Sequence, residues 1–235
     1  MFQKGNEGRV KRCMIFAAGN FCADGVIGKT LEMIVAQCED SFCIAADGGL
    51  DLIQELNIVP DLIIGDMDSL QSDDMLERFA QNKAVQIKRL PVEKDDTDML
   101  AAIREGLKAG CDSFELYGAL GGRIDHTLAN IQCLVFLLNN GAYGVLYGKG
   151  QRIELVRNSR ICFSKEMRRE NRRLSVFALG KDACGVTEKG LKYTLDEVIV
   201  RTDFPIGISN EFTDCESFVE VRDGTLLICV EDLQE

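Results

Sequence analysis

Short apolar segments alternate with segments of helical spacing over the first two-thirds of the chain, and this alternation constrains the fold most. The apolar segments cover residues 13–19, 42–49, 61–66, 84–90, 113–122 and 142–148, and the helical segments cover 26–38, 50–57, 72–82, 97–110 and 124–141. Strands that alternate with helices favour a parallel sheet covered by helices on both faces. The sequence therefore predicts a three-layer, Rossmann-like α/β domain over residues 1–154.

The hydrophobic period changes to two after about residue 150. Stretches such as RLSVFAL and SFVEVRDGTLLICVE predict a small antiparallel β-sandwich over residues 155–235. Asp223 and Gly224 stand between two alternating runs, which predicts a β-hairpin there. The arginine-rich stretch 157–173 is interpreted as a solvated hairpin or inter-domain loop.

Charge and cysteine usage narrow the class of protein. A net charge of −11 argues against a nucleic-acid partner, which requires a basic surface. The first residues are polar, with no apolar segment behind them long enough for targeting or for crossing a membrane, so no membrane partner is expected. The 10 cysteines form no C-x-x-C pair, so we expect a cytoplasmic protein with free thiols.

Polar residues follow the ends of five predicted strands. They are Gly19 and Asn20, then Asp47, Gly48 and Gly49, then residues 65–69, the loop 91–98, and the loop 118–126. In parallel α/β sheets, ligands bind beyond the carboxyl ends of the strands. The sequence therefore predicts a single site along one edge of the sheet.

Two carboxylates one residue apart, Asp66 and Asp68, end the third strand. Like charges this close repel each other unless a cation lies between them. The chain has one histidine, His126, which excludes a multi-histidine zinc site, and oxygen ligands favour magnesium. The alternative interpretation is a solvated acidic turn.

Asp98 offers a third carboxylate at the start of a predicted helix. The helix dipole favours a negative charge at that position. Helix capping is the alternative role in this loop, and Asp95, Asp96 and Thr97 compete for it.

The segment GALGGRIDH, residues 118–126, has the composition of a phosphate-binding loop. Its glycines let the backbone approach a ligand closely, and the following helix N-terminus favours an anion. Arg123 can bind phosphate oxygens with two parallel hydrogen bonds. Asp125 and His126 also have interpretations that involve no ligand. Asp125 is then a residue of the helix N-terminus, and His126 is a structural histidine.

Five stretches together resemble the thiamine pyrophosphokinase family, in matching order over nearly the whole chain. They are ADGGLDLIQELNIVPDLIIGDMDSL, LPVEKDDTDMLAAI, GALGGRIDHTLANI, GLKYTL and GISNEF. The resemblance implies an α/β catalytic domain, a β-sandwich that helps to bind thiamine, magnesium, ATP as co-substrate, and a homodimer with active sites near the subunit interface. Tyr193 is a departure, because some members carry tryptophan at that position.

The resemblance also implies a reaction and a set of site residues. The pyrophosphoryl group of ATP moves to the thiamine hydroxyl, giving thiamine diphosphate and AMP. The implied magnesium ligands are Asp66, Asp68 and Asp98, and these three act in catalysis with Arg123 and Asp125. The implied ATP-binding residues are Gly19, Asn20, Asp47, Gly48, Gly49, Thr97, Gly121, Gly122 and Arg123. The implied thiamine-binding residues are Asp125, Tyr193, Ser209 and Asn210.

Two alternative functions stay open from the residues alone. LIIGDMDSL also resembles the D-x-D motif of haloacid-dehalogenase-like phosphatases, in which Asp66 would be the nucleophile. That family carries a second acidic pair directly after an apolar strand, whereas PVEKDD is polar before its acids. A nucleotide- or thiamine-sensing module without catalysis is the other alternative.

Overall fold

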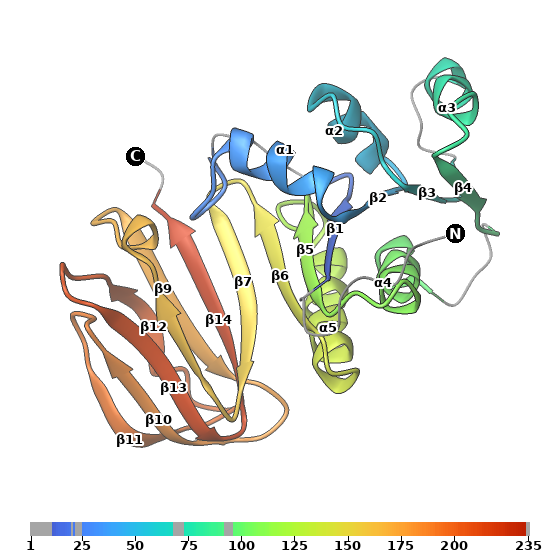
Figure 1. Ribbon diagram of the computed structural model, residues 1–235. Coiled ribbons are helices and arrows are strands. Elements are labelled where there is room, and N and C mark those ends of the chain that lie inside the picture. The colour runs from blue at the N-terminus through green and yellow to red at the C-terminus, as the bar shows by residue number, and fades with distance from the viewer. Residues whose placement is uncertain (1–10, 20, 22–24, 68–72, 92–95, 234–235) are drawn as a thin grey trace. The chain divides into compact units, whose positions relative to one another are not determined.

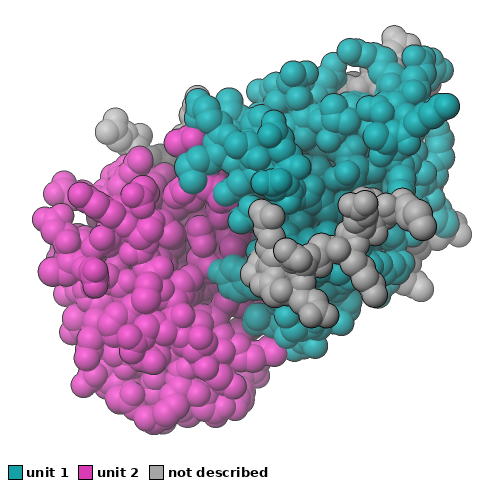
Figure 2. Space-filling view, viewed as in Figure 1, with its two compact units in different colours: residues 1–21, 31–144 teal, residues 22–30, 145–235 magenta. Residues whose placement is uncertain are grey.

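The computed structural model describes residues 11–19, 21, 25–67, 73–91 and 96–233. The chain forms two compact units, which Figure 2 colours separately. Unit 1 comprises residues 1–21 and 31–144, and unit 2 comprises residues 22–30 and 145–235. The sequence predicts a boundary after residue 154, whereas residues 145–154 lie in unit 2.

Unit 1 is a parallel sheet covered by helices, so the predicted α/β fold is confirmed. Its strands are β1 (Arg12–Phe16), β2 (Phe42–Ala46), β3 (Leu62–Gly65), β4 (Gln86–Arg89) and β5 (Ser113–Tyr117). Each neighbouring pair is parallel, in the order β5-β1-β2-β3-β4. The helices are α1 (Leu31–Glu39), α2 (Gly49–Glu55), α3 (Asp73–Ala80), α4 (Asp98–Lys108) and α5 (Ile124–Asn139). Figure 1 shows α1 and α2 on one side of the sheet, with α4 and α5 on the other.

The strand order reverses between β5 and β1, because β4 ends one edge and the chain then returns to the other side of β1. The loops after these two strands touch through glycines. Gly19 N donates to Gly118 O at 2.8 Å, and a Cβ on Gly118, which has a φ of +64°, would lie 2.3 Å from the Ala17 carbonyl oxygen. The two loops therefore meet at the point where open α/β sheets form their ligand crevice.

Unit 2 is a sandwich of two antiparallel sheets, as predicted. One sheet contains the strand order β12-β9-β14-β7-β6, and the other has the order β11-β10-β13-β8. The strands are β6 (Tyr143–Gly148), β7 (Gln151–Arg157), β8 (Arg160–Phe163), β9 (Arg172–Ala178), β10 (Ala183–Lys189), β11 (Leu195–Val200), β12 (Gly207–Glu211), β13 (Ser217–Asp223) and β14 (Thr225–Asp232). Inward-facing side chains from both sheets, including Leu174, Val186, Val219 and Ile228, form one apolar core.

The first helix begins later than the sequence predicts. The pattern predicts a helix over residues 26–38, but α1 begins at Leu31. Ile27 is 0% exposed and packs into the core of unit 2, and Gly28 has a φ of +78°. Val26 and Ile27 match helical spacing, yet the burial of Ile27 is provided by distant strands of the sandwich.

The predicted hairpin at Asp223 and Gly224 is wrong. β13 pairs with β10 and β8, whereas β14 pairs with β7 and β9. The turn therefore joins the two sheets of the sandwich. Gly224 has a φ of +125°, and a Cβ there would lie 2.9 Å from the Ala183 Cα, so glycine is needed for the close approach.

The arginine-rich stretch 157–173 includes β8, the 3-10 helix Lys165–Met167 and the start of β9. Arg172 in this stretch is 2% exposed. Its guanidinium donates to Asp232 Oδ1 at 2.7 Å and to the backbone oxygens of Glu166 and Met167. This arginine is thus a buried anchor, unlike the solvated residues that the sequence predicts here.

No helix among the described residues is both long and apolar enough to cross a membrane. The nine described cysteines are free thiols.

Candidate active site

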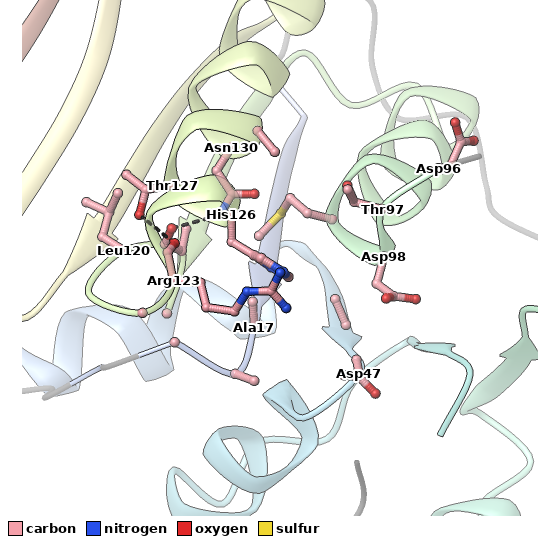
Figure 3. Close-up of a pocket in the computed structure, with 18 of the residues that line it drawn as sticks. Ala17, Asp47, Asp96, Thr97, Asp98, Leu120, Arg123, His126, Thr127 and Asn130 are labelled. Carbon is pink, nitrogen blue, oxygen red and sulfur yellow. Dashed lines mark hydrogen bonds between the residues drawn. The ribbon is translucent and has the colours of Figure 1, made fainter. Parts of the chain in front are cut away.

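A cavity of about 460 Å³ lies in unit 1 beyond the carboxyl ends of its strands (Figure 3). Its walls come from the loops after β1, β2, β3 and β5, from the start of α4 and from the first turns of α5. The lining residues are Ala17, Ala18, Gly19, Ala46, Asp47, Asp66, Asp96, Thr97, Asp98, Met99, Gly118, Ala119, Leu120, Gly122, Arg123, His126, Thr127, Ala129 and Asn130. A cavity is therefore present at the sheet edge where the sequence predicts a site.

Acidic side chains line one side of this cavity. Asp47 follows β2, Asp66 follows β3, and Asp98 is the first residue of α4. Asp47 and Met67 have left-handed φ values of 48° and 65°, a conformation that non-glycine residues adopt at an energetic cost. Asp47 N donates to Ile64 O at 2.8 Å, which ties the two strand ends together. The backbone is thus held in an unfavourable conformation where the carboxylates are presented.

One carboxylate oxygen in the cavity lacks a partner. Asp47 Oδ1 is buried and has no hydrogen-bond partner among the described residues. A buried acceptor without a donor destabilises the fold unless a ligand satisfies it. The cavity is thus suited to a donor or a cation that is not part of the chain.

The oxygen-rich lining fits magnesium bound together with a phosphate. The described residues contain no group of three His, Cys, Asp or Glu side chains arranged to hold a metal ion by themselves. Magnesium commonly uses one or two carboxylates and completes its shell with water and substrate phosphates. Asp66 and Asp98 can supply such a partial set, and Asp68 lies outside the described residues.

Arg123 faces the acidic side of the cavity from the N-terminus of α5. In Figure 3 its side chain extends across the cavity from the helix toward the side that carries Asp98 and Asp47. Its Nε and Nη2 donate to Asp125 Oδ1 and Oδ2 at 3.1 and 2.5 Å. The guanidinium holds the pKa of the Asp125 carboxyl below its usual range. Both side chains are exposed, so an entering anion can compete for the guanidinium.

The start of α4 resolves the capping alternative. Thr97 is the N-cap residue, and its hydroxyl accepts from Leu100 N at 3.1 Å. Asp96 instead forms an ion pair with Arg104. Asp98 is therefore not needed as the cap of α4.

Thr97→Ala should lower the free energy of unfolding by about 1 kcal/mol, because an alanine N-cap leaves a backbone N–H of the first turn without its acceptor. Thermal unfolding without added nucleotide measures this loss, and Thr97→Ser is the matched control that keeps the hydroxyl. Equal stability of the alanine and wild-type proteins would contradict the capping role.

Several lining residues were not predicted from the sequence. Asn130 on α5 is buried, and its Nδ2 donates to Ala119 O at 2.7 Å, which fixes the glycine loop against the helix. The Thr127 hydroxyl donates to Arg123 O at 3.4 Å. Asn130 could have been noticed in the sequence as a polar residue on the buried face of an apolar helix. Its contact with Ala119 could not be predicted, because Ala119 lies in the loop before that helix.

The predicted site residues of unit 1 fall into three groups. Those that line the cavity are Gly19, Asp47, Asp66, Thr97, Asp98, Gly122 and Arg123. Those that lie next to it in the chain are Gly48, Gly49, Gly121 and Asp125. Asn20 and Asp68 lie outside the described residues. The roles of the residues in all three groups, in binding and in catalysis, remain predictions.

The three remaining candidates belong to unit 2. Tyr193 is 60% exposed. Ser209 is exposed, with a φ of 59°, and its backbone N donates to Ser175 Oγ at 3.1 Å. Asn210 is 5% exposed, and its amide bonds to other groups of unit 2. Their roles in thiamine binding remain predictions.

Two family models match the chain and together span most of it. Residues 36–144 match the thiamin pyrophosphokinase catalytic domain, and residues 158–226 match the thiamin pyrophosphokinase vitamin B1 binding domain. A thiamine pyrophosphokinase from Bacillus subtilis (strain 168) is 27% identical over 191 residues, covering 81% of this chain and 87% of the relative. Thiamine pyrophosphokinase 2 from Oryza sativa subsp. japonica is 25% identical and covers 86% of this chain and 73% of the relative.

Solved structures share the fold over nearly the whole chain. The crystal structure of a Bacillus subtilis thiamine pyrophosphokinase has a TM-score of 0.80 at 24% identity, covering 96% of this chain and all of that one. The structure of a thiamin pyrophosphokinase from Candida albicans has a TM-score of 0.77 at 17% identity, covering 95% and 89% of the two chains.

Proposed function

The chain belongs to the thiamine pyrophosphokinase family, and we propose that it transfers the pyrophosphoryl group of ATP to the hydroxyl of thiamine, releasing AMP. One observation carries this proposal: the cavity at the strand-order reversal has carboxylates on one side and Arg123 on the other. Such a lining can bind a polyphosphate together with a metal ion. The metal ion on the carboxylate side and Arg123 on the other side would then neutralise the negative charge of the polyphosphate.

ATP would lie along the loops after β1, β2 and β5. The loops after β1 and β5 lie close to each other, because Gly19 and Gly118 have no side chains to separate their backbones. The N-terminus of the long helix α5 favours a phosphate, and Gly122 and Arg123 are at that position. We assign Asp47 and Thr97 to the nucleotide as well, because both line the same cavity.

Asp66 and Asp98, with Asp68, would hold magnesium against the phosphates. The ion, when bound, supplies positive charge that neutralises the polyphosphate and orients it. The protein contributes fixed carboxylates on strand and helix ends, so little reorganisation accompanies the reaction.

The chemical step needs positioning more than covalent catalysis. The thiamine hydroxyl oxygen attacks the β-phosphorus, a new oxygen–phosphorus bond forms, and the bond from that phosphorus to the oxygen bridging to the α-phosphate breaks. AMP leaves with that oxygen, and the hydroxyl proton is released to solvent. Arg123 would offset the charge that develops on the transferred group. Asp125, kept ionised beside Arg123, would orient the attacking hydroxyl.

Unit 2 would contribute to thiamine binding, and a homodimer would complete the site. Several apolar side chains of residues 193–208 in this unit are exposed; they are Tyr193, Ile199, Phe204, Ile206 and Ile208. Exposed apolar groups of this kind fit a second copy of the chain. A cytoplasmic location, where ATP and magnesium are both available, completes the proposal.

Tyr193→Ala should raise the thiamine KM several-fold and leave the ATP KM nearly unchanged. An aromatic stacking contact contributes roughly 0.5–1.5 kcal/mol beyond the buried area, and Tyr193 is exposed enough to make one. Titrations with thiamine and with a non-hydrolysable ATP analogue separate the two effects. Equal losses for both ligands, or a lower melting temperature with a normal thiamine KM, would remove Tyr193 from the site.

The function is tested by mixing the protein with ATP, thiamine and magnesium and identifying the products by mass. Thiamine diphosphate and AMP in equal amounts are the expected products. A sensing module would bind both ligands without forming AMP. Family membership already argues against the phosphatase alternative, and a phosphoaspartate trapped on Asp66 would favour it.

A further inference from the structure

A short loop of unit 2, residues 190–194, presents Tyr193 to solvent between β10 and β11; we call it the tyrosine loop. The side chain of one residue holds both backbone polar groups of Tyr193. Tyr193 N donates to Asn210 Oδ1 at 3.0 Å, and Asn210 Nδ2 donates to Tyr193 O at 2.7 Å. The position of the exposed tyrosine therefore depends on the orientation of the Asn210 amide.

The Asn210 amide has no hydrogen-bonding capacity left. Its Oδ1 also accepts from Glu211 N at 2.9 Å, and its Nδ2 also donates to Glu188 Oε2 at 2.8 Å. Two accepted and two donated bonds use all the capacity of a primary amide. Asn210 is also almost fully buried, so its contacts are with the loop and the sandwich.

Glu188 is a side-chain partner of this amide, and it favours the same orientation as the three backbone contacts. A rotated amide would place Asn210 Oδ1 against the oxygens of Glu188 and Tyr193, and Nδ2 against the N–H groups of Tyr193 and Glu211. The three backbone contacts would then be repulsive, and so would the contact with an ionised Glu188. Glu188 offers an acceptor oxygen to Nδ2 whether its carboxyl is ionised or protonated.

The environment of Glu188 indicates a specific role for a carboxyl group there. Glu188 lies on β10, is 1% exposed, and its Oε1 is buried with no hydrogen-bond partner among the described residues. Burial raises its pKa to about 7. A buried carboxyl with one unpaired oxygen destabilises the folded state relative to an apolar side chain of similar size, so stability alone does not explain it.

We infer that Glu188 is a positioning residue, which fixes the Asn210 amide and through it holds the tyrosine loop in the conformation that binds thiamine. This inference rests on the proposed function, because it assigns the loop to thiamine. Glu188 acts through Asn210 and Tyr193, and it is not placed in contact with the substrate.

Glu188→Met removes the acceptor and keeps an unbranched side chain of similar length. We expect the thiamine KM to rise roughly three- to tenfold, which corresponds to the loss of one oriented hydrogen bond. The ATP KM and the kcat at saturating thiamine should stay within about twofold of wild type. Glu188→Gln keeps an acceptor for Asn210 Nδ2 and should restore the thiamine KM.

Glu154→Met is the matched control for general destabilisation. Glu154 is also fully buried in unit 2, one of its oxygens has no partner in the described part of the chain, and its pKa is raised by burial to about 8. Its Oε1 accepts from Arg152 Nε at 2.7 Å, so this substitution also leaves a donor without its acceptor. It should lower the melting temperature and leave the thiamine KM unchanged.

A fluorescence measurement separates this inference from the proposed function. The chain contains no tryptophan, so Tyr193→Trp places the only tryptophan on the loop, and thiamine should quench its fluorescence without ATP being present. The same quenching should require more thiamine when Glu188→Met is added. A normal thiamine midpoint in folded Glu188→Met, or an equal effect of Glu154→Met, would overturn the inference. Absence of AMP from the wild-type protein would overturn only the proposed function.

Discussion

Asp66→Asn and Asp98→Asn should each lower kcat by roughly 100- to 1,000-fold, since a charge-neutralising metal contact contributes several kcal/mol to the transition state. Both carboxylates line the cavity, one after β3 and one at the start of α4. Asparagine keeps the shape of the side chain but removes the negative charge. The assay is AMP formation at saturating magnesium, and Asp68→Asn belongs in the same series.

Stability measurements complete this test. Removing one member of an acidic cluster relieves repulsion when no metal is bound, so the melting temperature of Asp66→Asn should be equal to or higher than that of wild type. Asp40→Asn, an exposed carboxylate outside the cavity, is the control that should change neither quantity. Near-normal turnover of either cavity variant would show that its carboxylate does not bind the metal.

Arg123→Lys should lower kcat by roughly 10- to 100-fold while changing the ATP KM by less than about threefold. Lysine keeps the charge but loses the planar group that donates two parallel hydrogen bonds. Arg123 makes such a two-bond contact with Asp125, so its geometry suits a phosphoryl group that gains charge in the transition state.

Steady-state kinetics with ATP as the varied substrate measure this split. Arg78→Lys, on the exposed side of α3, is the control and should behave as wild type. A change in the ATP KM alone would assign Arg123 to ground-state binding of the nucleotide.

The position of the cavity could be predicted from the sequence, because the ends of strands are marked by local patterns and meet at one edge of a parallel sheet. Once the strands alternate with helices, their carboxyl ends share one edge, and Asp47, Asp66 and Asp98 follow from that rule. Thr97 could be proposed as a cap from its chemistry alone, although Asp95 and Asp96 competed with it.

The remaining features depend on long-range contacts that no local pattern contains. Ile27 matches helical spacing, but its burial depends on strands that begin more than a hundred residues later. Asp223 and Gly224 specify a tight turn, but the choice of sheet for β14 depends on its pairing with β7 and β9. The burial of the Asn210 amide becomes understandable only from its hydrogen bond to Glu188, which lies on a different strand.

The placement of Ile27 in the core of unit 2 also affects how the chain can fold during synthesis. Residues 22–30 leave the ribosome early, yet the strands that bury Ile27 are made only when residues 145–235 follow. Until then this apolar side chain has no core to enter, and closing such a distant contact is slow. A fragment that begins at residue 145 would likewise lack part of its own interior, so unit 2 is a structural unit that a single cut of the gene does not isolate.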